Sequence, residues 1–129
     1  MPHPAHGQVL NASLWVTQAL LCLSFCIGGV MKLGLPVERL SKLFAWTGEV
    51  PKPFLRFIGA VDLAGGVGIL LPELTNVLPQ LTVPAALGCT VLQACAIAFH
   101  TRRGELRETP ANFVFLALSA FVLWGRWGD

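Results

Sequence analysis

Charged residues are scarce in this chain: they make up 12% of its 129 residues, whereas hydrophobic residues make up 54%. Soluble domains contain about 25% charged residues, so this chain has too few charges to cover a surface that faces water. The shortage excludes an ordinary soluble domain and predicts an integral membrane protein.

The sequence signals of most enzyme classes are also absent. The chain has no haem, flavin or iron–sulfur motif and no pairing of a nucleophile with a base, so we predict no catalytic residue and a non-enzymatic role. It has no Gly/Ser-rich linker, low-complexity tract or repeat, which predicts one domain over residues 1–129. Its basic residues lie beside apolar runs, as topology signals do, which argues against a nucleic-acid partner.

The four cysteines form neither a CxxC pair nor a zinc-ligand pattern, so we predict no metal site. They are Cys22, Cys26, Cys89 and Cys95, all inside apolar runs. Cys22 and Cys26 are four residues apart and would share one face of a helix. We interpret them as small packing residues; a redox or metal pair within the bilayer is the alternative.

Four apolar runs predict four membrane-spanning helices, over residues 14–33, 54–72, 81–99 and 111–127. A span needs about 20 residues, and the fourth run reaches that length only if Arg126 extends its charge to the interface. The first run has no basic segment before it and no clear cleavage pattern, so we expect a span and not a signal peptide. The predicted fold is an all-α transmembrane four-helix bundle.

The segment between the first two spans predicts a short amphipathic helix over residues 36–47. Pro36 suits the first turn of a helix, and most of the apolar side chains that follow fall on one side. Such a helix would lie in the headgroup region, with Trp46 as its aromatic anchor.

Basic residues predict the orientation of the spans. Eight of the nine Lys and Arg residues lie in the first and third loops or the helix ends beside them. The positive-inside rule then places these two loops in the cytoplasm and both termini, with the second loop, outside the cell membrane.

Small residues are concentrated in the second and third spans. They are Gly59, Ala60, Ala64, Gly65, Gly66 and Gly68 in the second span, with Ala86 and Ala94 in the third. Hydrophobicity cannot drive helix association in lipid, whereas close approach of small residues can. We therefore predict tight packing between these two helices, with Ala60, Ala64 and Gly68 forming a ladder.

Asp62 is the most unusual residue, because it lies well inside the second span. It is roughly 12 Å of helical rise beyond Phe54, and a carboxylate at the bilayer centre costs about 2.5–3.5 kcal/mol. Counting residues along each span predicts a polar cluster near it, consisting of Lys32, Asp62, Gln93, His100 and Asn112, with Arg56 at its mouth. The cluster is either a structural tie between helices or a ligand or proton site.

The stretches "GGVMKL", "RFIGAVDLAGGVGILLPEL", "FHTRRGE" and "NFVFLALSAFVLWGR" occur in this order over about residues 28–126. The combination resembles the DoxX-like family of small four-helix membrane proteins, although the family usually has Glu where this chain has Asp62. The resemblance implies a bacterial or organellar membrane protein. Relatives include subunits of thiosulfate:quinone oxidoreductases, members of oxidative-stress membrane complexes, and a receptor-assembly chaperone. The resemblance implies no catalytic motif.

Three functional hypotheses follow. The first is a subunit or scaffold of a membrane complex, which binds a lipid or a quinone in the polar pocket around Asp62. The second is a quinone-interacting redox subunit, and the third is a carrier of protons or small solutes. The expected partners are membrane lipids and either further copies of the chain or other membrane subunits.

Overall fold

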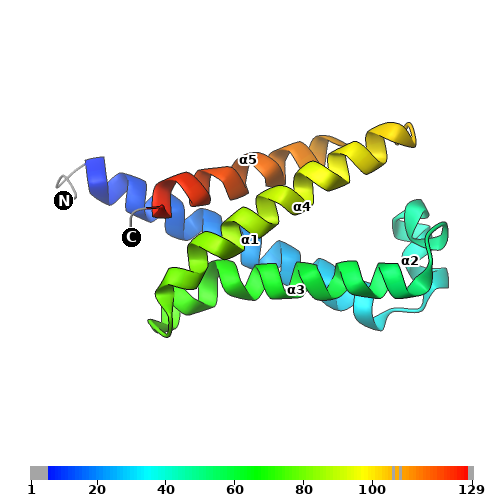
Figure 1. Cartoon of the computed structure of the whole chain (residues 1–129), viewed down its shortest axis with the longest axis horizontal. Helices are drawn as coiled ribbons and strands as arrows, with labels where there is room; N and C mark the ends of the chain where they lie inside the picture. The colour runs from blue at the N-terminus through cyan, green and yellow to red at the C-terminus, as the bar shows by residue number, and fades with distance from the viewer. Residues whose placement is uncertain (1–5, 106, 108, 128–129) are drawn as a thin grey trace.

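The structure is a computed structural model that describes residues 6–105, 107 and 109–127. Its elements, in order, are α1 (His6–Gly34), α2 (Val37–Leu43), the 3-10 helix η1 (Ala45–Gly48), α3 (Lys52–Thr75), the 3-10 helix η2 (Pro79–Leu81), α4 (Thr82–Arg102) and α5 (Thr109–Arg126) (Figure 1). The described residues contain no strand, which confirms the all-α prediction.

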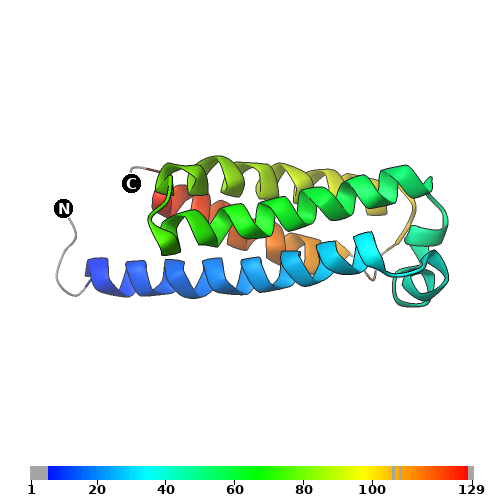
Figure 2. The same ribbon diagram turned by 90° about the horizontal axis from the view of Figure 1, so that it is seen from below.

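The long helices form two pairs that run along a common axis. α1 packs along α3, and α4 packs along α5 (Figures 1 and 2). The start of α1, the end of α5 and η2 lie at one end of the molecule, and α2 lies at the other. Towards the α2 end the two pairs diverge (Figure 1).

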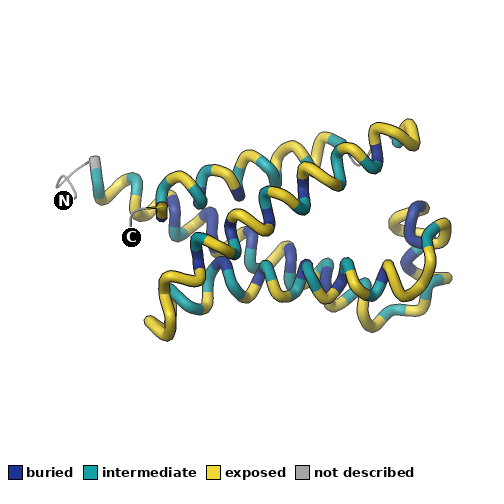
Figure 3. Tube along the Cα trace, in the orientation of Figure 1, coloured by how far each residue is buried: buried dark blue, intermediate teal, exposed yellow. Residues whose placement is uncertain are grey.

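Three helical segments are long and apolar enough to cross a membrane: Gly7–Gly34, Lys52–Thr75 and Pro79–Arg102. α5, with 18 residues, is not among these segments. Figure 3 shows exposed residues along the outer sides of all the long helices. On α1 these include Leu20, Leu23 and Ile27, each more than half exposed. Apolar surface on this scale is typical of helices that face lipid.

Glycines bring α1 and α3 into close contact. A Cβ atom added to Gly29 would lie 2.7 Å from the carbonyl oxygen of Gly59, and one added to Gly66 would lie 2.9 Å from Sγ of Cys26. Such distances leave no space for a side chain, so the two backbones nearly touch. The α1–α3 contact is therefore a tight helix pair that the sequence analysis did not predict, since small residues favoured close packing of the second span on the third.

The predicted small-residue ladder on α3 is not formed within the chain. Gly65 and Gly68 do face α4, where added Cβ atoms would lie 2.8 Å from Sγ of Cys89 and 2.9 Å from Cβ of Ala85. Ala60 and Ala64, however, are exposed. Some glycines of α3 contact α1 and others contact α4, whereas Ala60 and Ala64 face outwards. On α4, Ala86 is fully buried and Ala94 is exposed.

The α2–η1 segment (residues 37–48) packs on the bundle more closely than predicted. Leu40 is fully buried, and with Trp46 and Leu55 it forms a small core at this end. The indole of Trp46 meets the ring of Phe99 edge-on at 5.8 Å. Trp46 is therefore a packing residue of the protein and not the exposed membrane anchor that the sequence predicted.

The glycine contact between α1 and α3 makes a direct prediction. Gly29→Ala should destabilise the protein by about 1–3 kcal/mol, as overpacking does, because the new methyl group meets backbone atoms of α3. The matched control is Gly88→Ala on α4, where nothing lies within 4 Å of the added Cβ. Thermal unfolding in mild detergent should show a lower midpoint for the first variant alone; equal midpoints would contradict the close approach.

Candidate functional site

Asp62 is paired with Lys32 across the α1–α3 contact. Nζ of Lys32 lies 2.5 Å from Oδ2 of Asp62, and the aspartate is only 5% exposed. The lysine reaches back over Gly28, whose added Cβ would lie 3.8 Å from Nζ, in the direction that helical side chains take. The pair neutralises both charges and so lowers the cost of placing a carboxylate at this depth.

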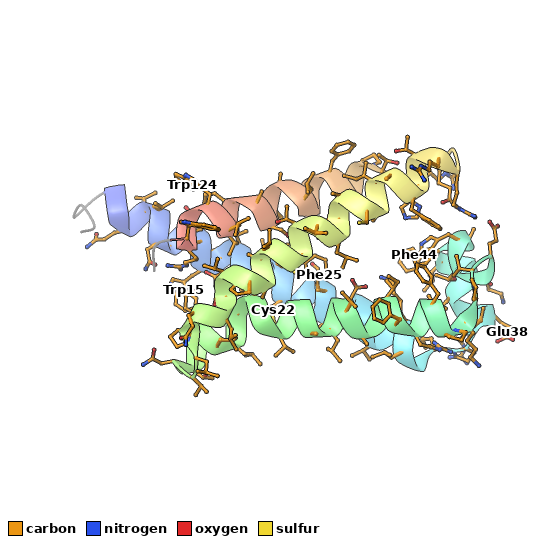
Figure 4. All side chains as sticks on the ribbon, in the orientation of Figure 1. Trp15, Cys22, Phe25, Glu38, Phe44 and Trp124 are labelled. Carbon is orange, nitrogen blue, oxygen red and sulfur yellow. The ribbon has the colours of Figure 1, made fainter. Side chains whose placement is uncertain are left out.

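The Lys32–Asp62 pair lines a cleft of about 1080 Å³ between the two helix pairs. The five residues that the sequence predicted to cluster, Lys32, Asp62, Gln93, His100 and Asn112, all line this cleft. Aromatic side chains make up much of the remaining wall. Figure 4 shows two of them: Phe25 lies between the helix pairs, and Phe44 lies on the side of α2–η1 that faces α4.

The two amides of the cluster stand out because their hydrogen bonds are incomplete. Gln93 on α4 is 5% exposed. Its Oε1 atom and the Nδ2 atom of Asn112 on α5 are both buried, and neither finds a partner within the described part of the chain. Both residues line the cleft, although these two atoms are themselves enclosed by protein atoms.

His100 belongs to a small polar group at the end of α4. Gly104, with φ of +71°, turns the chain back, and the amide of Glu105 donates to the carbonyl of His100, as at many helix C-termini. This places Oε1 of Glu105 2.8 Å from Nδ1 of His100 and 3.0 Å from Nε of Arg103. Glu105 was not among the residues predicted from the sequence, although the glycine just before it signals the turn.

The charge of Glu105 depends on these two neighbours. Partial burial would raise the pKa of its carboxyl group, but the hydrogen bonds and charges of His100 and Arg103 outweigh burial and hold the pKa below its usual value. The pairing therefore contributes stability above the ordinary carboxyl range, and this contribution is lost as the pH falls through the lowered pKa.

The sequence predicted Arg56 at the mouth of the polar cluster, but Arg56 is not among the residues that line the cleft. Its Nη1 atom donates to the carbonyl oxygens of Lys32 and Leu35, the latter at 3.0 Å. These carbonyls are at the C-terminal end of α1, where the helix leaves acceptors without partners. Arg56 points from α3 towards this end and satisfies them, so it is a helix-capping residue.

The α2–η1 segment forms part of the cleft wall, through residues 41–46. Trp46 contacts the ring of His100 edge-on at 5.8 Å, and Nζ of Lys32 lies 5.9 Å from the centre of the indole. Beyond η1, Glu49 forms an ion pair with Arg103 near the end of α4. These contacts join the segment to both helix pairs.

A second polar cluster lies at the opposite end of the bundle, around Arg126. The sequence predicted that Arg126 extends to the interface, but the structure leaves it only 5% exposed. Its Nε lies 2.9 Å from Oε1 of Gln18 and 3.2 Å from Oε2 of Glu73, and its Nη1 donates to Asn11 at 2.8 Å. The guanidinium thus joins α5 to α1 and α3.

Gln18 and Glu73 are the residues of this cluster that sequence reasoning missed. Gln18 is fully buried, and its Nε2 donates to the carbonyl of Ile69 at 2.8 Å and to Glu73 at 3.2 Å. Two features of the sequence could have identified them: Gln18 is an amide inside an otherwise apolar span, and Glu73 is an acid at the end of the next span. Both amide ends of Gln18 are used, so this cluster is a structural connection with nothing left to bind a ligand through that residue.

The cysteine pair lies in the α1–α3 contact. The Sγ atoms of Cys22 and Cys26 are 3.9 Å apart, and Cys26 faces the backbone of Gly66. Among the described residues no group of three or more His, Cys, Asp or Glu side chains is arranged to hold a metal ion.

Comparison with known proteins identifies a family that the chain matches. The model of the DoxX-like family matches residues 16–122, which is most of the chain and includes every residue of the cleft cluster. No curated protein and no solved structure matches the chain.

Proposed function

Because the chain belongs to the DoxX-like family, and because its polar cluster lines a cleft, we propose a ligand-binding scaffold. In this proposal the protein is a non-enzymatic subunit of a membrane complex that holds a lipid or a quinone in the cleft around Asp62. The observation that carries the proposal is the cleft itself, of about 1080 Å³, whose lining combines the Lys32–Asp62 pair with aromatic side chains.

The size and lining of the cleft support an amphiphile as its ligand. Binding pockets for small molecules typically have volumes of about 300–1,000 Å³, with apolar walls and a few polar groups that set orientation. The cleft has about 1080 Å³ and combines aromatic walls with the Lys32–Asp62 pair. A ring or an acyl chain would contact the walls, and a polar head group would face the pair.

We further propose that α5 is a fourth membrane crossing. Its 18 residues are few for a span, but the burial of Arg126 against Gln18 and Glu73 supports it, because the terminal charge is neutralised inside the bundle. The loops at the α2 end would then face the cytoplasm, where eight of the nine basic residues gather. α2 would lie in the headgroup region, with the exposed Leu43 towards lipid.

The other two hypotheses receive less support. A quinone bound in the cleft would make the protein a redox subunit only if another subunit supplied electrons, because the chain has no redox motif. A proton or solute carrier would need a path between the two polar clusters. The fully buried side chains of Leu21, Ile69 and Val122 form an apolar core between them along the helices.

Filling the cleft tests the proposal. Ala96 lines the cleft on α4, so Ala96→Trp should remove a co-purifying amphiphile almost completely, because the indole takes its place. The matched control is Ala94→Trp, which puts the same indole on the exposed side of α4. Native mass spectrometry of the protein in mild detergent, with analysis of bound lipids and quinones, measures the difference. Equal ligand content in both variants would mean that the cleft is not the binding site.

A further inference from the structure

The acidic side chains on the cleft lining are compensated by cations of the protein itself. Among the described residues these acids are Asp62 and Glu105. Asp62 is paired with Lys32 at 2.5 Å. Glu105 is paired with His100 at 2.8 Å and with Arg103 at 3.0 Å. Neither carboxylate is therefore left to attract a cation from outside.

Two basic side chains at the α2 end of the cleft have no such compensation. Lys42 lies in the last turn of α2, and Arg107 follows α4, whose C-terminus lies at the same end of the molecule (Figure 1). Both residues line the cleft, and both are exposed. Neither forms an ion pair with another described residue. This end of the cleft therefore carries an excess of positive charge.

The apolar part of the cleft lining extends to the outer surface of the helices. Ile27 on α1, Leu43 on α2 and Phe54 on α3 all line the cleft, and all three side chains are exposed. In a membrane, exposed apolar side chains of this kind face lipid. A molecule dissolved in the bilayer could therefore enter the cleft from the side without passing through water.

We infer that the cleft binds an anionic phospholipid, with its acyl chains between the helix pairs and its headgroup at the α2 end, near Lys42 and Arg107. Basic pockets between membrane helices are typical sites for anionic headgroups. Attraction between charges extends over about 8 Å at physiological salt, so the two side chains need not contact one oxygen. A quinone or a zwitterionic lipid has no net charge and would gain little from them. This inference rests on the proposed function, since it names the ligand class for the same cleft.

Competition between two lipids tests the headgroup separately from binding as such. Palmitoyl-oleoyl-phosphatidylglycerol and palmitoyl-oleoyl-phosphatidylcholine have the same acyl chains, but only the first has a net negative charge. An equimolar mixture is added to the delipidated protein in mild detergent, and native mass spectrometry measures how much of each lipid is retained. We expect about tenfold more phosphatidylglycerol, because each basic side chain near an anionic headgroup strengthens binding a few-fold.

Two double variants locate the preference. Lys42→Gln/Arg107→Gln removes both charges from the cleft lining and should retain the two lipids equally. The matched control, Arg39→Gln/Arg102→Gln, removes the same charge from exposed residues of α2 and α4 that lie outside the cleft lining. This control should keep the preference of the parent protein. All four side chains are exposed, so neither variant should change folding.

The outcomes separate this inference from the proposed function. Equal retention of the two lipids by the parent protein, with both lost in Ala96→Trp, would overturn the anionic headgroup and leave the ligand-binding cleft standing. A preference that both double variants keep, or that both lose, would also overturn it, because the charge on the cleft lining would then not be the cause. Retention of both lipids by Ala96→Trp at the level of the parent would overturn the proposed function as well.

Discussion

Arg126→Met is expected to lower the free energy of unfolding by about 3–5 kcal/mol, the usual cost of removing one partner of a buried ion pair. The guanidinium lies 3.2 Å from Glu73 and 2.9 Å from Gln18, and it is almost completely buried. Without it, a carboxylate and an amide oxygen remain inside the bundle without their donor. Denaturant titration of the protein in mild detergent measures the loss.

Two further variants show whether the charge is the cause. Adding Glu73→Gln to Arg126→Met should restore part of the stability, because the uncompensated charge disappears. Arg102→Met removes an exposed arginine from the end of α4 and should change stability by much less. If Arg126→Met and Arg102→Met unfold at the same denaturant concentration, the second polar cluster does not hold the helices together.

The second large effect is expected at the cleft, where Lys32→Met should destabilise the protein more than Asp62→Asn does. Removing the lysine leaves the Asp62 carboxylate unpaired at depth, a cost of about 2.5–3.5 kcal/mol on insertion scales. Removing the carboxylate leaves Lys32 near the end of α1, where its long side chain can reach the interface. Unfolding midpoints of the two variants in detergent measure this asymmetry.

The double variant Lys32→Met/Asp62→Leu should regain most of the stability lost in Lys32→Met, since apolar replacement of both partners leaves no buried charge. Asp62→Asn should keep the bundle assembled and yet alter ligand binding, because a neutral amide replaces the carboxylate beside the cleft. Larger destabilisation by Asp62→Asn than by Lys32→Met would mean that the aspartate has partners other than Lys32.

Much of the fold could be predicted, because hydropathy locates the spans and residue counting gives the depth of each residue along its span. Depth counting placed Lys32, Asp62, Gln93, His100 and Asn112 in the same half of the bundle, and the structure places all five on one cleft. The spans themselves follow from runs of apolar residues long enough to cross a bilayer. Neither inference requires knowledge of which helices are neighbours.

The direction in which a side chain points was harder to predict, because it depends on the neighbouring helix. Arg56 has the right depth for the cluster, but it faces the end of α1. Ala60 and Ala64 have the spacing of a packing ladder, but glycines of α3 are already in contact with α1 and α4. Spacing along one helix gives a face and does not identify the helix that covers it.

The second polar cluster could not be predicted, because its members looked ordinary one at a time. Arg126 and Glu73 lie near the ends of apolar runs, where charges normally face the interface. Gln18 and Arg126 are 108 residues apart in sequence, so their bond is visible only in three dimensions. Trp46 was misjudged for a similar reason, since an aromatic at a membrane boundary is usually an anchor.

Synthesis of the chain from its N-terminus delivers the charges of the Lys32–Asp62 pair in a favourable order. Lys32 emerges first, and its flexible side chain can remain at the membrane boundary until α3 arrives. Asp62, whose side chain is too short to reach that boundary, would then enter the bilayer with its counter-ion already present. The contact between Gly29 and Gly59, one turn away, brings the two helices close enough for the pair to form as α3 inserts. The carboxylate therefore need never cross the hydrocarbon layer alone.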